Sequence, residues 1–425
     1  MIKNKQRIKL ILSALILLVS FNAAIAWDNH ALPSYIVLGA FKEIKDAPSV
    51  PVEKLEVFLK SEKDKIPLVL EDIDSWSKKN MPYYVETPDE LKFKKDISDS
   101  ELIVSFYKSI RINPNYKKAY YAQDIPGNLK KSKFLPWNAV TIYKEPFKLT
   151  EQYFYEVSPG TMLSPIEIIS TASDEPDFGM DLLLWEDNGT DYGKEYKFGE
   201  QPFGDPKLEY SSQAPFHIGY YHESSIIFSM GSFLKRTYPR FRIYQFLQLS
   251  RLAFKTGHPY WGYRFLGWGL HYVQDLTQPY HSTVLPGVGT VKMLWINFID
   301  MIGFHDSKIS VIDRVSKRHQ IIENHQYNVV KEILEKKEFK NAIISSLTDE
   351  SADGNYGAWN DDYIINVLTK ESHDYSEKLD EEIEKLGNVN GDVKLPSNHK
   401  LTEVVTELLL KFGIHTRIFI KAGIN

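Results

Sequence analysis

The chain has 425 residues, of which 43% are hydrophobic and 25% are charged. These values are typical of a globular protein and exclude a disordered chain, a collagen and a coiled coil. The formal charge of −5 leaves no basic excess for a phosphate backbone, so we expect no stable nucleic-acid partner. The chain has no cysteine, so any metal must be bound mainly by His, Asp and Glu.

Residues 1–26 have the pattern of a secretory signal peptide. Four basic residues precede an apolar run over 10–19, and the small residues Ala24 and Ala26 stand on either side of Ile25. We therefore expect cleavage after Ala26, a mature chain that begins at Trp27, and a secreted or periplasmic location. An uncleaved membrane anchor is the alternative, but the apolar run is short for one.

Helical patterns dominate the first half of the mature chain. Apolar residues at helical spacing predict a helix within 52–80, whereas 83–160 shows no clear period and is expected to be mostly loops with short elements. The segment Ser164-Pro-Ile-Glu167 combines a capping box with a first-turn proline and predicts a helix that ends near Ala172. Turn-forming residues predict loops over 174–215.

The second half is more regular. Periodic apolar positions and the Gly-Pro break after Thr256 predict helices over 243–254, 260–276, 311–337 and from 401 to about 412. No regular β alternation is long enough for a sandwich or a βαβ series. We expect an all-α fold with long loops, forming a single enlarged domain over 27–425 with its motifs within about 165–335.

Two residue pairs at helical spacing carry the chemistry. His271 and Asp275 are four residues apart, so both side chains lie on one face of the same helix, and His281 follows after Pro279. His271 stands in the apolar segment 265–273, where an unpaired ionisable group is costly. One such pair alone is more often an ion pair or a satisfied core histidine.

A second pair and the expected N-terminus strengthen a metal hypothesis. His319 and Glu323 have the same spacing on another predicted helix. A free α-amine and carbonyl at Trp27 can chelate a cation, and His30 follows three residues later. With no cysteine thiolate in the chain, imidazole and carboxylate groups favour zinc.

The motif His271-x-x-x-Asp275-x-x-Gln278-Pro279-x-His281, with mature Trp27 and the later His319-x-x-x-Glu323, resembles the secreted zinc-dependent phospholipase C family. That family is related to fungal zinc nucleases that cut single strands. The resemblance covers 27–30 and about 170–330. Residues 31–165 and 335–425 match no pattern of the family, and the chain is longer than its compact members.

The family also uses an early histidine, then an aspartate and another histidine. His30 matches the first, although it lies closer to Trp27 than is usual. For the aspartate, Asp177 is preferred because it precedes an aromatic residue, with Asp174 as the alternative. For the second histidine, His217 is preferred over His222 on local context.

The resemblance implies a multihelical fold, a three-zinc cluster and catalytic roles for Asp177 and Asp275. In the family pattern the three ions would be held by Asp177, His217, His271 and Asp275; by the Trp27 amine and carbonyl, His30 and the bridging Asp275; and by His281, His319 and Glu323. The zincs would activate a water that attacks phosphorus and would stabilise the leaving alkoxide.

The expected function is phospholipase C activity on a phospholipid such as phosphatidylcholine, which releases diacylglycerol and a phosphorylated head group. A zinc-dependent single-strand nuclease and a non-enzymatic zinc-stabilised secreted binding protein are the alternatives. The apolar segment 284–304 between His281 and His319 is expected either to contact a membrane surface or to fill the core of the enlarged fold.

Overall fold

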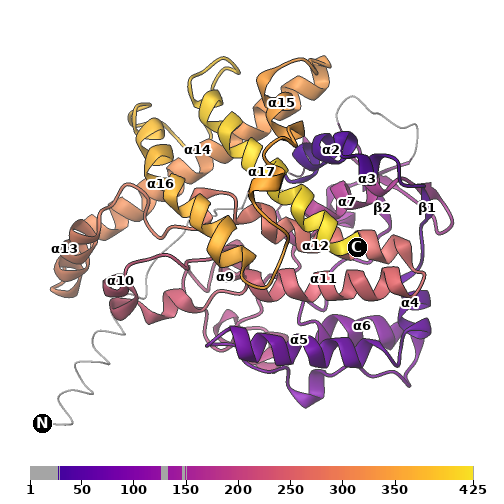
Figure 1. Ribbon diagram of the computed structural model, residues 1–425. Helices are drawn as coiled ribbons and strands as arrows, with labels where there is room; N and C mark the ends of the chain where they lie inside the picture. The colour runs from indigo at the N-terminus through magenta and orange to yellow at the C-terminus, as the bar shows by residue number, and fades with distance from the viewer. Residues whose placement is uncertain (1–26, 28, 126–132, 146–148, 150, 425) are drawn as a thin grey trace, which may run out of the picture.

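The computed structural model describes Trp27, residues 29–125, 133–145, Leu149 and 151–424 (Figure 1). The expected signal peptide lies outside these residues. About 60% of the structure is helical and 3% is strand, which agrees with the predicted all-α class. No helix in the described part has the length and apolar composition needed to cross a membrane.

The first half of the chain holds shorter helices. They are α2 (Ala31–Ala40), α3 (Lys42–Lys45), α4 (Leu55–Ser61), α5 (Ile66–Asn80), η1 (Asp89–Leu91), α6 (Asp99–Ser109), η2 (Trp137–Ala139), α7 (Pro165–Asp174), η4 (Glu175–Phe178), η5 (Glu186–Asn188), α8 (Asp191–Tyr196), η6 (Tyr210–Gln213) and α9 (Ala214–His217).

The longest helices follow, together with several short ones. They are α10 (Ser225–Met230), η7 (Ser232–Lys235), α11 (Pro239–Lys255), α12 (Pro259–Asp275), η8 (Pro279–His281), α13 (Thr290–Met301), α14 (Asp306–Lys336), α15 (Ala342–Thr348), η9 (Asp353–Asn355), the π-helical turn η10 (Ile364–Leu368), α16 (Thr369–Glu384) and α17 (Leu401–Ile424).

Strands are few and short. β1 (Val50–Pro51) pairs antiparallel with β5 (Met162–Leu163), with Val50 opposite Leu163. β4 (Phe154–Glu156) pairs antiparallel with both β2 (Tyr121–Gln123) and β3 (Phe134–Leu135). These two small sheets lie near α2 and α7 in Figure 1, so they support the helical core rather than form a layer of their own.

The centre of the molecule is the hairpin of α11 and α12, against which α7, α17 and α5 pack (Figure 1). The two helices meet at the predicted break after Thr256, and a proline begins α12. Almost every side chain from Tyr260 to Asp275 is buried, which explains the apolar character of this helix. Two ionisable residues near its C-terminal end, His271 and Asp275, therefore lie inside the protein.

Helices α7 and α12 approach closely at Gly267. A Cβ atom at this position would lie 2.5 Å from the Cβ of Ala172 and 2.9 Å from the carbonyl oxygen of Ile169. Only glycine avoids this clash with the backbone of α7. The close contact brings the C-terminal end of α7 beside His271.

The N-terminal half differs from its prediction at three places. Segment 174–215, expected to be loops, contains the short helices η4, η5, α8, η6 and the start of α9. The helix expected within 52–80 is broken at 62–65, and Pro67 occupies the first turn of the second piece, α5. Segment 83–160, expected to be mostly loops, contains the eleven-residue helix α6. Its signal is the capping box of Ser98 and Glu101, which precedes the buried residues of the helix.

The C-terminal helix is also longer than predicted. It was expected to end near Phe412, before Gly413, but α17 continues to Ile424. Gly413 lies inside the helix, where it allows α17 to pack closely against α15. A Cβ atom at this position would lie 2.5 Å from the carbonyl oxygen of Leu347. The following residues are buried against the central hairpin, and this burial stabilises the added turns.

Candidate metal centre

Eight ionisable residues from distant parts of the chain meet near the C-terminal end of α12. The structure forms three groups whose ligand atoms lie within 4.8 Å of one another, and each group could hold a metal ion. The groups are His30, His271 and Asp275; Asp177, His217 and His271; and His281, His319 and Glu323.

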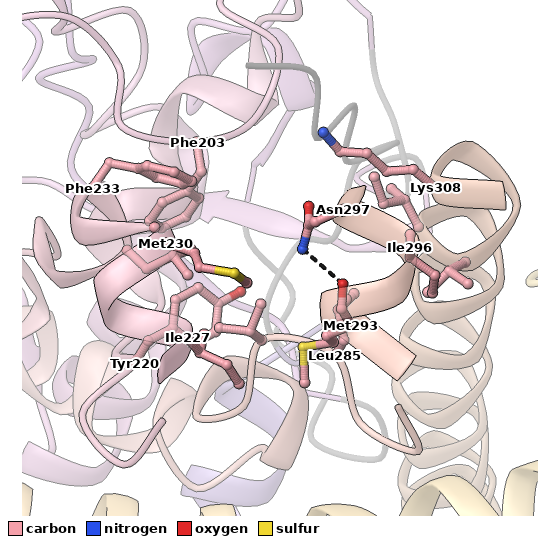
Figure 2. A pocket seen from close by; sticks show the side chains of 15 residues that line it. Phe203, Tyr220, Ile227, Met230, Phe233, Leu285, Met293, Ile296, Asn297 and Lys308 are labelled. Carbon is pink, nitrogen blue, oxygen red and sulfur yellow. Dashed lines mark hydrogen bonds between the residues drawn. The ribbon is translucent and has the colours of Figure 1, made fainter. Parts of the chain in front are cut away.

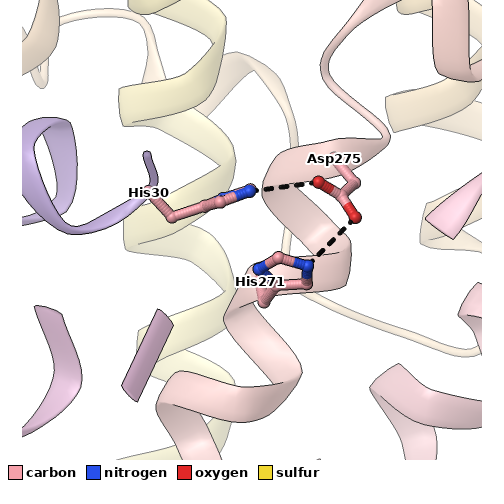
Figure 3. A group of neighbouring side chains, drawn as sticks. All are labelled: His30, His271 and Asp275. Atoms are coloured by element: carbon pink, nitrogen blue, oxygen red, sulfur yellow. Dashed lines mark ion pairs between the residues drawn. The ribbon is translucent and has the colours of Figure 1, made fainter. Parts of the chain in front are cut away.

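Asp275 links the first two groups. Its Oδ1 lies 3.2 Å from Nε2 of His30, and its Oδ2 lies 2.8 Å from Nδ1 of His217 and 3.3 Å from Nε2 of His271. Figure 3 shows His30 reaching across from the start of α2 toward the carboxylate on α12. One oxygen of the Asp275 carboxylate thus faces His30, and the other faces His217 and His271, as expected for a bridging ligand.

Asp177 completes the second group from the short helix η4. Its Oδ1 is 3.6 Å from Nε2 of His271 and 3.8 Å from Nδ1 of His217. Its side chain is 12% exposed, whereas the side chains of His30, His271 and Asp275 are fully buried. Asp177 is therefore the most exposed side chain of the first two groups.

The third group joins η8 to α14. Nε2 of His319 lies 2.5 Å from Oε1 of Glu323, one helical turn away, and Nε2 of His281 lies 3.9 Å from the same oxygen. All three side chains are nearly completely buried. Nε2 of His281 has no hydrogen-bond partner in the described part of the chain, and leaving a buried nitrogen unsatisfied is costly. A cation between these side chains would remove that cost.

Oxygen atoms outside the centre orient its histidines. Nδ1 of His30 lies 3.0 Å from the amide oxygen of Gln274, Nδ1 of His271 lies 2.7 Å from the carbonyl oxygen of Ser173, and Nδ1 of His281 lies 3.0 Å from that of His217. A protonated Nδ1 can donate to each acceptor, which leaves the lone pair of Nε2 directed into the centre. Metal-binding histidines commonly show this arrangement.

His217 has the opposite orientation. Its Nδ1 faces Asp275, and its Nε2 lies 3.4 Å from Oδ2 of Asp181. Asp181 is fully buried, and its Oδ1 accepts hydrogen bonds from the guanidinium of Arg242. No motif in the sequence marks Asp181 or Arg242, and the only signal for Asp181 is its position four residues after Asp177.

Asp174, the alternative to Asp177, is not in any of the three groups. Its carboxylate accepts hydrogen bonds from the backbone N–H groups of His30 and Ala31 and from the side-chain amide of Asn29. These contacts cap the first turn of α2 from outside that helix. Asp174 therefore positions His30, and the geometry favours Asp177 as the ligand.

His222, the alternative to His217, also lies away from the three groups. Its Nε2 is 3.0 Å from the carbonyl oxygen of Ile365 and 3.1 Å from Oγ1 of Thr369, and its ring packs near His373. His222 therefore connects the segment after α9 to η10 and the start of α16 through these hydrogen bonds. The geometry thus favours His217 for the centre.

Trp27 is completely buried beside the end of α12. Its indole N–H lies 3.0 Å from the carbonyl oxygen of Gln274 and 3.3 Å from Oγ1 of Thr277, and its ring meets Phe412 edge to face. These contacts hold the expected mature N-terminus next to the helix that carries Asp275, three residues before His30.

Burial and neighbouring charges shift the pKa values of several groups in the centre. Burial raises the pKa of Asp177 to about 8. Burial opposes the charged form of His217, but the hydrogen bonds to Asp181 and Asp275 outweigh it and raise its pKa to about 10. Burial lowers the pKa of His281 to about 3. Strong perturbations of this kind are typical of functional sites.

The donor set consists of imidazole nitrogens and carboxylate oxygens, which suits several divalent metals. The geometry therefore supports a cluster of metal sites without identifying the metal. Comparison of the chain with models of known protein families gives no match, and neither does comparison with curated proteins or with solved structures.

Proposed function

We propose that this chain is a secreted zinc-dependent phosphodiesterase with phospholipase C activity and the multihelical fold of the family that its motifs resemble. The observation that carries the proposal is the position of Asp275, whose two oxygens face His30 on one side and His217 and His271 on the other. A shared carboxylate would hold two cations close together, and the third group lies beside the first two through the His281–His217 contact.

Zinc ions bound in these groups would supply a water activated at neutral pH and would stabilise negative charge on phosphoryl oxygens. The side chains have distinct tasks. Asp275 would be shared between the ion near His30 and the ion near His217 and His271. Asp177, the partly exposed carboxylate of the centre, is in position to orient a water or accept a proton. Trp27 is expected to contribute its α-amine and carbonyl after signal-peptide removal.

Two features favour a lipid substrate over a nucleic acid. The chain has a formal charge of −5, which gives no general attraction for a polyanion. An apolar pocket and the exposed apolar residues of α13 lie in the segments that follow His217 and His281. A phospholipid such as phosphatidylcholine presents an anionic diester next to aliphatic chains, which matches this combination of groups.

The proposal is tested with the mature protein beginning at Trp27. Turnover is measured on phosphatidylcholine vesicles, on a soluble chromogenic phosphodiester and on single-stranded DNA, each with and without chelator, and bound metal is quantified. We expect release of phosphocholine, loss of activity with chelator, recovery with zinc and inactivity of Asp275→Asn. Turnover of DNA alone would favour a nuclease, and zinc binding without any turnover would favour a binding protein.

A further inference from the structure

An apolar pocket of about 80 Å³ lies between α10 and η7 on one side and α13 and α14 on the other (Figure 2). Phe203 and Phe233 form one side of it, and Met293 and Ile296 from α13 form the opposite side. Most of the remaining lining is also aliphatic or aromatic. A pocket of this composition cannot compensate the desolvation of a charged ligand, but it can receive hydrocarbon.

The few polar groups of the lining leave little hydrogen-bonding capacity for a ligand. Nδ2 of Asn297 donates to the carbonyl oxygen of Met293 at 3.0 Å, and Nζ of Lys308 pairs with Asp300 at 3.0 Å. The hydroxyl of Tyr220 is the exception: it is buried and has no hydrogen-bond partner among the described residues. The pocket thus combines an aliphatic wall with one buried hydroxyl that a ligand oxygen could satisfy.

The pocket shares two chain segments with the metal centre. Tyr220 follows His217 by three residues, and Val284 follows His281 by three residues. The two segments are held together, because Nδ1 of His281 meets the carbonyl oxygen of His217 and the N–H of Gly219 donates to the carbonyl oxygen of His281 at 2.8 Å. A molecule in the pocket would therefore lie against the same segments that carry two of the expected ligands.

The outer side of α13 is apolar as well. Val291 is 80% exposed, Trp295 61% and Phe298 47%, while Met293 and Ile296 on the inner side line the pocket. In Figure 1, α13 and α10 project together at one edge of the molecule. Large exposed apolar side chains clustered on one helix mark a surface that contacts a partner, and a lipid surface accepts them without specific hydrogen bonds.

We propose that this pocket binds an aliphatic chain of a lipid and that the outer side of α13 contacts the lipid surface from which the chain enters. This inference rests on the proposed function for the identity of the lipid as substrate. The pocket itself, however, is a hydrocarbon site whether or not the metal centre is catalytic, so the two proposals can be tested separately.

The first experiment uses the absence of cysteine from the chain. Met230→Cys places a unique thiol in the partly exposed lining of the pocket, and Leu68→Cys places one on α5, at a residue that is 64% exposed. Maleimide labelling of each is timed with and without dodecanol. We expect at least about tenfold slower labelling at position 230 with dodecanol and no change at position 68.

The second experiment separates the pocket from catalysis. Met230→Trp fills the pocket from a half-buried position, and Tyr220→Phe removes only the hydroxyl. Binding of a fluorescent polyene fatty acid is titrated to each variant. We expect Met230→Trp to weaken binding about tenfold and both variants to retain wild-type turnover of the soluble phosphodiester.

The two proposals fail in different ways. If no phosphodiester is hydrolysed, the proposed function fails, but saturable binding of the fatty acid and protection of position 230 still support the pocket. If labelling at position 230 is unaffected by dodecanol, or Met230→Trp binds the fatty acid as wild type does, the pocket is a packing feature and the inference is overturned.

Discussion

The carboxylate of Asp181 lies 3.4 Å from Nε2 of His217, on the side of the imidazole that faces away from Asp275. Arg242 holds this carboxylate, and burial is complete for both partners. Despite burial, the Arg242 charge and the contact with His217 keep the pKa of Asp181 below its usual value. Asp181 is therefore an anion that orients the His217 ring through Nε2. It does not belong to any of the three groups that could hold a metal ion.

Asp181→Asn should weaken metal binding without removing a ligand. An outer partner of a metal-bound histidine typically contributes about 10–100-fold in affinity, because it sets ring orientation and basicity. The measurement is zinc affinity by competition with a chromogenic chelator. Asp174→Asn is the matched comparison, since it should weaken the site that contains His30 instead. Unchanged affinity in Asp181→Asn would show that the His217 orientation depends on packing alone.

Zinc binding should release protons at pH 7. The pKa of His217 is raised to about 10 without metal, so the imidazole carries two protons at neutral pH, and its Nδ1 proton must leave before that nitrogen can bind zinc. Affinity should therefore rise with pH across the neutral range, by about tenfold per pH unit for each proton released. Calorimetry in two buffers with different ionisation enthalpies counts these protons.

The variants for this measurement are His217→Ala and His222→Ala. The first should release fewer protons, because the group that holds the extra proton is gone. The second should match wild type, since His222 contacts Ile365 and Thr369 rather than the centre. Equal proton release from all three proteins would place the titrating group elsewhere.

One extra alanine before Trp27 should reduce bound zinc from three ions to two. It converts the α-amine into an amide nitrogen, which has no lone pair for a metal at neutral pH. Metal content and diester turnover are measured on the mature and extended proteins. Trp27→Phe is the control: it keeps the amine but loses the indole hydrogen bond to Gln274, so we expect a smaller loss. Full activity of the extended protein would exclude a role for the amine.

Replacing both Trp295 and Phe298 by serine should weaken binding to phosphatidylcholine vesicles and spare turnover of a soluble diester. Both side chains are largely exposed on α13, so their loss removes apolar contact with lipid at little cost to the fold. Vesicle sedimentation measures the binding. Val57→Ser together with Leu68→Ser removes two exposed apolar side chains from α4 and α5 and should have no effect. Equal loss on both substrates would indicate a core role for α13.

Gly267→Val should destabilise the protein by roughly 2–4 kcal/mol, because the added side chain forces α12 away from the backbone of α7. Gly39→Ala in α2 is the control, since nothing lies within 4 Å of the new Cβ atom, and it should be neutral or slightly stabilising. Urea unfolding measures both. If Gly267→Val is as stable as wild type, the two helices do not need this close contact.

Features that depend on local spacing could be predicted from the sequence alone. His271 and Asp275 share a helical face because a turn of helix repeats every 3.6 residues, and the structure places both in one buried centre. The start of α7 at the Ser164 capping box and the break after Thr256 follow from the same short-range rules. These features need no knowledge of the rest of the chain.

Features that depend on which loops come into contact could not be predicted and are known only from the tertiary structure. Asp174 and Asp177 are three residues apart, and only the contact of Asp174 with the start of α2 separates their roles. His217 and His222 differ in the same way, since one meets α12 and the other α16. Asp181 had no motif to mark it, because its role arises from the approach of α9 and α11. Such contacts join residues far apart in sequence, where no period or spacing rule applies.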